Sequence, residues 1–188
     1  MKHLGIDPGK ENYAMVLLGD RGEVVHAQML EETISSMKAK DAYMRPRYRK
    51  TMRVLLRKLR PDVVMTEQFA ARRFGTQSSE VVNLMIGSLS AITDYLRIED
   101  RTTLPSTWKN AIAKFLDLDE LYAYGKKLGM PPHPIDALCL AIFSRGDFAY
   151  TKSALRPIKK LVRNVKKQLL IHSPSIVKQK KRAKRGKK

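Results

Sequence analysis

Residues 3–31 read HLGIDPGKENYAMVLLGDRGEVVHAQMLE, and this stretch decides the fold. Three short apolar runs, at residues 3–6, 13–18 and 24–30, are separated by the turn sequences DPGK at 7–10 and GDRG at 19–22. Apolar runs that are so short and so close together favour three antiparallel strands joined by hairpins. The chain is therefore predicted to begin with an antiparallel three-strand meander.

The sequence after the meander alternates between helical and strand patterns. A basic segment with an apolar stripe at residues 37–60 predicts a helix, which Pro61 ends, and DVVMTE at 62–67 predicts a buried, parallel strand. Helices are further predicted near residues 78–96 and 118–128. A short strand is predicted at 102–104, followed by a helix with Ser106 as its N-cap, and a last helix begins at Pro134. This order predicts a mixed α/β fold with helices packed on a central sheet.

The positive charge of the chain is concentrated at its C-terminus. Lys and Arg number 37 against 18 Asp and Glu, and 15 of the 37 lie in residues 151–188, which contain no acid. Residues 1–150 thus carry 22 basic and 18 acidic side chains. We therefore predict a domain at 1–150 and a basic extension at 151–188, helical to about residue 170 and disordered beyond. A polyanion, nucleic acid ahead of a membrane surface, is the expected partner, and a solubilising or localisation tail is the alternative.

Several classes of protein are excluded by what the sequence lacks. The single cysteine, Cys139, excludes an intrachain disulfide framework and a cysteine-based zinc site. No apolar run approaches the roughly 18 residues of a membrane span, and the N-terminus does not read as a signal peptide, so a cytoplasmic protein without a membrane partner is expected. The DPG turn resembles a phosphate loop of actin-like ATPases, but 188 residues leave no room for their second domain. No small-molecule cofactor is expected, since a G-x-x-x-x-G-K-[ST] loop is absent too.

Three acids stand at the ends of apolar elements, where they are badly placed for solubility and well placed to share a pocket. Asp7 and Glu67 end predicted strands, and Asp136 lies in the first turn of an apolar helix, three residues after His133. Clustered carboxylates repel one another, and a divalent cation such as Mg²⁺ or Mn²⁺ relieves that repulsion, with His133 as a nitrogen ligand. The alternatives are a common turn for Asp7, a solvated strand end for Glu67 and a favourable helix start for Asp136.

Three short blocks make the sequence resemble a known family. GIDPG at 5–9, TEQF at 66–69 and HPIDAL at 133–138 resemble, in order and spacing, the RuvC family of Holliday junction resolvases over about residues 1–145. The small size and the basic tail look more like the phage-type branch than the bacterial one, from which the long tail departs.

This resemblance implies a ribonuclease-H-like fold and a homodimer. It also implies an enzyme of DNA recombination and repair, a crossover junction endodeoxyribonuclease. Such an enzyme nicks four-way DNA junctions symmetrically and uses two Mg²⁺ or Mn²⁺ ions per active site. By position, Asp7, Glu67 and Asp136 would be metal carboxylates, and His133 would be a metal ligand or proton carrier. Its alternative role is a turn residue before Pro134. Lys109, in TWKN at 107–110, matches a family lysine near the scissile phosphate. A second family lysine has no clear counterpart. The expected products are a 5′-phosphate and a 3′-hydroxyl.

Aromatic and basic residues near these blocks are candidates for DNA contacts. Phe69 matches a family aromatic that stacks at the junction centre, and Phe74 is the better DNA-facing candidate on physical grounds because Arg72 and Arg73 flank it. Either aromatic could instead belong to the core. The phosphate-contact candidates, for which a solvated face is the alternative, are Arg49, Arg53, Lys159 and Lys160.

Two other functions fit the same composition. One is a broader branched-DNA, flap or RNA nuclease of the same fold, and the other is a non-catalytic basic DNA-binding protein. Small residues at 87–91 make the helix that carries them a candidate dimer interface, with packing against its own sheet as the alternative.

Overall fold

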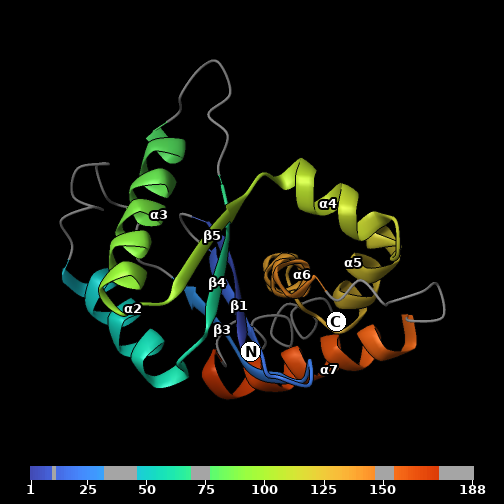
Figure 1. Cartoon of the computed structure of the whole chain (residues 1–188). Coiled ribbons are helices and arrows are strands. Elements are labelled where there is room, and N and C mark those ends of the chain that lie inside the picture. Colours follow the sequence, from blue (N-terminus) through green and yellow to red (C-terminus); the bar gives the residue numbers. More distant parts are fainter. Residues whose placement is uncertain (10–11, 32–45, 69–76, 147–154, 174–188) are drawn as a thin grey trace, which may run out of the picture.

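The computed structural model describes residues 1–9, 12–31, 46–68, 77–146 and 155–173. A five-stranded sheet with the order β3-β2-β1-β4-β5 forms its centre (Figure 1). Its strands are β1 (His3–Pro8), β2 (Asn12–Leu18), β3 (Val24–Glu31), β4 (Val63–Glu67) and β5 (Glu99–Thr103).

The strand pairing confirms the predicted mixed sheet. Strands β1, β2 and β3 form an antiparallel meander, whereas β4 pairs in parallel with both β1 and β5. Alternate residues of β2 join the clusters on opposite faces of the sheet as the pleat requires: Tyr13, Met15 and Leu17 lie with Leu4 and Ile6 in one, and Ala14, Val16 and Leu18 lie in the other. Strand β5 begins at Glu99, three residues before the predicted strand at 102–104.

Helices cover both faces of the sheet (Figure 1). Helices α2 (Pro46–Leu59) and α3 (Gln77–Tyr95) enclose one apolar cluster, and the other face carries α4 (Pro105–Ala113), α5 (Leu118–Lys127), α6 (His133–Arg145) and α7 (Leu155–His172). The prediction of Ser106 as an N-cap is wrong. Helix α4 begins with Pro105 after Leu104 in the N-cap position, because the fixed φ of proline already suits a first helical turn.

The helical part of the basic tail belongs to the second apolar cluster. Ile158, Val162, Val165 and Leu169 of α7 are buried in the same cluster as residues of α4 and α6. The predicted amphipathic helix is confirmed, while the predicted boundary near residue 150 and the segment beyond 173 lie outside the described residues. In the part of the chain that the structure describes, no helix is long and apolar enough to cross a membrane.

Two histidines join α7 to the edge strand β3. The rings of His26 and His172 lie 4.3 Å apart between centroids, and the Ser173 hydroxyl bonds to both the amide and the carbonyl of Met29. Burial lowers the pKa of His26, and the charges of His172 and Lys58 lower it further; burial and Lys58 also lower the pKa of His172.

We expect acid to loosen this contact. The pKa values of His26 and His172 in the folded protein lie below the value of about 6.5 in the unfolded chain. The two neutral rings therefore stabilise the fold above that pH, and this contribution to the free energy of unfolding is lost as the pH falls below it. Thermal unfolding at pH 7.5 and 5.5 should show a smaller acid-induced fall in Tm for His172→Gln than for the wild type. Comparing the two proteins cancels the contribution of the other titrating groups. An equal fall in both would contradict this prediction.

Candidate active site

Two of the predicted acids lie at the carboxyl ends of neighbouring parallel strands. Ile6 of β1 is paired with Thr66 of β4, so the next residues, Asp7 and Glu67, lie side by side at the same edge of the sheet. The residues before them are buried, whereas Asp7 and Glu67 are partly exposed. The sheet therefore places both carboxylates at an edge that solvent can reach.

Helix α6 brings the other two predicted residues to this edge. His133 and Asp136 lie in its first turn, and His133 Nδ1 is 2.8 Å from Asp7 Oδ2. A carboxylate can only accept a hydrogen bond, so His133 Nδ1 carries a hydrogen and donates a hydrogen bond to Asp7 Oδ2. The close approach depends on Gly5, because a Cβ there would lie 2.0 Å from the Ala137 carbonyl oxygen in α6.

The pKa values of Glu67, His133 and Asp136 are all shifted by the charges around them. Burial raises the pKa of Glu67, and the charges of Asp7 and Asp136 raise it further. The pKa of Asp136 is raised by burial and by the charge of Asp7, and Lys109 partly opposes the rise at both acids. The pKa of His133 is raised chiefly by its hydrogen bond to Asp7. The structure thus brings together Asp7, Glu67, His133 and Asp136, with Lys109 beside them.

Two aromatic side chains that sequence reasoning gave no role also reach this site. Trp108 Nε1 donates to Glu67 Oε2 over 2.7 Å, and the Tyr122 hydroxyl donates to Asp136 Oδ1. Trp108 adjoins the predicted Lys109, but nothing in the local pattern distinguishes it from a core residue. Tyr122 lies 14 residues before its partner and carries no sequence signal.

The residue types present fit a hard divalent cation. Carboxylate oxygens are the ligands that Mg²⁺ and Mn²⁺ prefer. Burial is the main cause of the raised pKa values of Glu67 and Asp136, and the negative charge of Asp7 adds to both, a repulsion that a cation would relieve. Within the described ranges, however, no group of three or more His, Cys, Asp or Glu side chains is arranged to hold a metal ion. One oxygen of each acid is engaged by a protein donor instead, namely His133, Trp108 or Tyr122.

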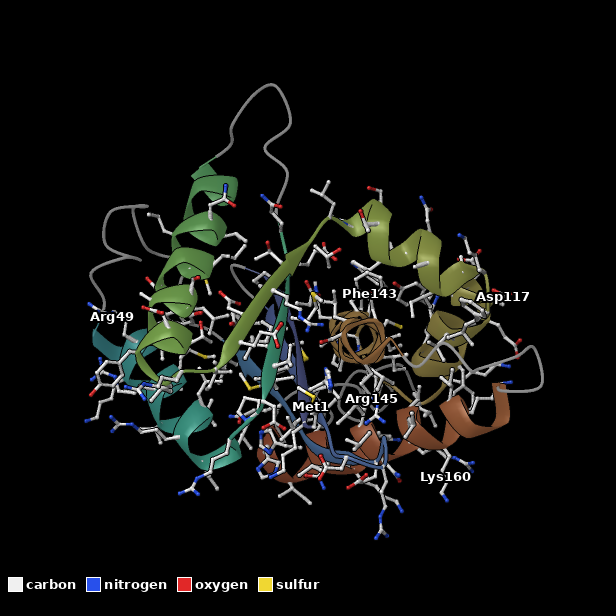
Figure 2. The ribbon with its side chains drawn as sticks, viewed as in Figure 1. Met1, Arg49, Asp117, Phe143, Arg145 and Lys160 are labelled. Atoms are coloured by element: carbon white, nitrogen blue, oxygen red, sulfur yellow. The ribbon has the colours of Figure 1, made fainter. Side chains whose placement is uncertain are left out.

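The candidate phosphate contacts do not form one surface. Arg49, on α2, and Lys160, on α7, lie on opposite sides of the molecule (Figure 2). Arg53 lies over the ring of Tyr95, 5.6 Å from its centroid. Lys159 Nζ is bonded to Glu120 Oε1 at 2.5 Å, whereas Lys160 is exposed. The remaining candidates, which fall outside the described residues, are Phe69, Arg72, Arg73 and Phe74.

A cavity of about 710 Å³ lies beside α4 and α5. Its lining runs from Lys109 through the loop between the two helices to Glu120. Both charge signs occur in it, Lys109 and Lys114 being basic and Asp117, Asp119 and Glu120 acidic. Lys109 therefore connects the acidic edge of the sheet to an open cavity.

Solved structures share the fold of this chain, while sequence comparison finds no relative. No protein-family model and no curated protein matches the chain. The structure is similar to RuvC of Thermus thermophilus in complex with Holliday junction substrate, with a TM-score of 0.60 and 19% identity over 79% of this chain and 97% of that one. A second structure of the Thermus thermophilus protein gives a TM-score of 0.59 and 20% identity, with 78% and 96% covered. The chain therefore has the ribonuclease-H-like fold of RuvC.

Proposed function

We propose that this chain is a metal-dependent DNA endonuclease that resolves four-way junctions by paired, symmetry-related nicks, acting as a homodimer in the cytoplasm. The observation that carries the proposal is the convergence of Asp7, Glu67, Asp136 and His133 from two parallel strands and one helix. The shared fold supports it, since Thermus thermophilus RuvC, with that fold, is solved with a junction substrate. Assignment to the phage-type branch rests on size and tail alone.

The proposed chemistry gives different tasks to the carboxylates, to His133 and to Lys109. Asp7, Glu67 and Asp136 would hold two Mg²⁺ or Mn²⁺ ions, with His133 as a further ligand or proton carrier. Such ions supply a nucleophilic hydroxide near neutral pH and neutralise the leaving oxygen. His133 keeps the Asp7 carboxylate oriented through the hydrogen bond that its Nδ1–H donates to Asp7 Oδ2. The Lys109 ammonium, whose charge reaches both Glu67 and Asp136, would balance negative charge that develops on the scissile phosphate.

A panel of substrates tests the proposal. Purified protein with Mg²⁺ would be given a four-way junction, a linear duplex, a flap and an RNA–DNA hybrid. We expect paired nicks at symmetry-related positions of the junction, with 5′-phosphate and 3′-hydroxyl ends. Cuts spread over flaps and hybrids would indicate a broader structure-selective nuclease. Binding without cleavage in either Mg²⁺ or Mn²⁺ would mean that the protein only binds DNA.

Two neighbouring lysines of α7 allow a test of the DNA-binding surface. Lys160 is exposed, whereas Lys159 is paired with Glu120 and lies 5.5 Å from the centroid of the Tyr124 ring. Lys160→Ala should lower the slope of log affinity against log salt by about 1, because it removes one phosphate contact. Lys159→Ala should change this slope less. Fluorescence anisotropy with a labelled junction measures both slopes, and a wild-type slope in Lys160→Ala would remove α7 from the DNA-binding surface.

A further inference from the structure

Trp108 is the only tryptophan of the chain and is fully buried, at 0% exposure. Its ring belongs to the apolar cluster formed by α4, α6 and α7, so the surrounding packing fixes its orientation. The single polar atom of the ring, Nε1, points at the edge of that cluster, where it donates to Glu67 Oε2 over 2.7 Å. A rigid ring therefore holds one oxygen of an acid at the candidate active site.

The hydrogen bond between Trp108 and Glu67 has only one possible direction, because an indole N–H donates and cannot accept. Glu67 Oε2 is therefore the acceptor, and the buried ring sets its position.

The same ring also contacts the neighbouring cation. Lys109 Nζ lies 5.1 Å from the centroid of the Trp108 ring, within the range of a cation–π contact. Trp108 therefore touches both an acid proposed to hold metal and the lysine proposed to balance phosphate charge.

We propose that Trp108 is a positioning residue, which orients the carboxylate of Glu67 for metal binding and holds the ammonium of Lys109 beside it. The inference rests on the proposed function, since it assigns a task within the same site. A purely structural Trp108 would affect the stability of the fold and leave metal affinity unchanged. Metal affinity is accordingly the property that separates the two roles.

The first test measures Mn²⁺ binding to the full chain by calorimetry without DNA. Trp108→Phe keeps an aromatic ring in the cluster and removes the N–H donor. We expect its Mn²⁺ affinity to fall about 10- to 100-fold, as is usual when a group that orients a metal ligand is lost. The rate constant kcat should fall while KM for the junction stays unchanged. Ile112→Val, in the same helix and cluster, is the matched control and should keep the wild-type affinity.

The second test needs no change to Trp108. Because the chain has no other tryptophan, its tryptophan fluorescence reports on Trp108 alone. Adding Mg²⁺ to the wild type should shift this emission, and Glu67→Gln should abolish the shift. The measurement remains decisive if Trp108→Phe folds poorly.

The outcomes separate the inference from the proposed function. If the wild type binds Mn²⁺ and Trp108→Phe binds it equally well, with no Mg²⁺-dependent emission change, the positioning role is wrong and the proposed function stands. If the wild type binds no metal at all, the metal site itself is overturned, and this inference with it.

Discussion

Replacing Asp7 by Asn should abolish cleavage of a four-way junction and leave junction binding intact. Asp7 is the penultimate residue of the central strand β1 and its side chain is 13% exposed, so the carboxylate is held near the edge of the sheet. Asn has the same shape and can still accept the hydrogen bond from His133, but it lacks the charge that holds a divalent ion. We expect the cleavage rate to fall at least roughly 10³-fold. Single-turnover cleavage and anisotropy measured in one buffer give the two quantities.

The matched control is the same substitution at an acid outside the site. Asp117 is the N-cap of α5, where its side chain accepts from the Glu120 amide. Asn caps a helix about as well as Asp, so Asp117→Asn should keep both fold and cleavage. Binding by Asp7→Asn should equal or exceed that of the wild type, because a negative charge near DNA is lost. Cleavage at the wild-type rate in Asp7→Asn would show that the active site lies elsewhere.

Gly5→Ala should produce the largest loss of stability. An added Cβ would lie 2.0 Å from the Ala137 carbonyl oxygen and 2.4 Å from the Ala141 amide nitrogen. Both atoms belong to the backbone of α6, so no side chain can turn aside and the helix must move away from β1. We expect a cost of about 3 kcal/mol. For a domain of this size this corresponds to a fall in Tm of roughly 6–12 °C.

The same substitution should also weaken the site, because α6 carries His133 and Asp136. Even the fraction that folds should bind Mn²⁺ more weakly than the wild type. Gly87→Ala, in the exposed middle of α3, is the control, since its added Cβ meets nothing within 4 Å. That change should stabilise the helix by about 0.5–1 kcal/mol. A loss of stability at Gly87 that depends on protein concentration would instead identify this face of α3 as an interface between two copies.

Much of the fold could be predicted from the sequence because the signals for it are local. Apolar runs and turn residues in 3–31 predict the meander, and the buried run that ends at Glu67 predicts a parallel strand. Helical spacing in the basic tail predicts α7. Where the prediction was wrong, at the start of α4, two local signals competed: a serine that favours capping and a proline that already fits the first turn.

Only part of the candidate active site could be predicted from the sequence. Asp7, Glu67 and Asp136 stand out in the sequence as acids at the ends of apolar elements, and the resemblance to a known family added the role of His133. Their roles as metal ligands remain predictions, since the described side chains are not arranged around one ion. The four candidates at 69–74 lie outside the described residues.

By itself, the sequence determined the strand order of the meander, the acids at the ends of apolar elements and the excess of charge in the tail, all of which follow from patterns a few residues long. Only the tertiary structure decided that Trp108 contacts Glu67 and that Tyr122 contacts Asp136. It also decided that Arg49 and Lys160 lie on opposite sides of the sheet (Figure 2). Contacts of this kind depend on how whole helices pack across the sheet, and the spacing of residues along the chain does not specify that packing.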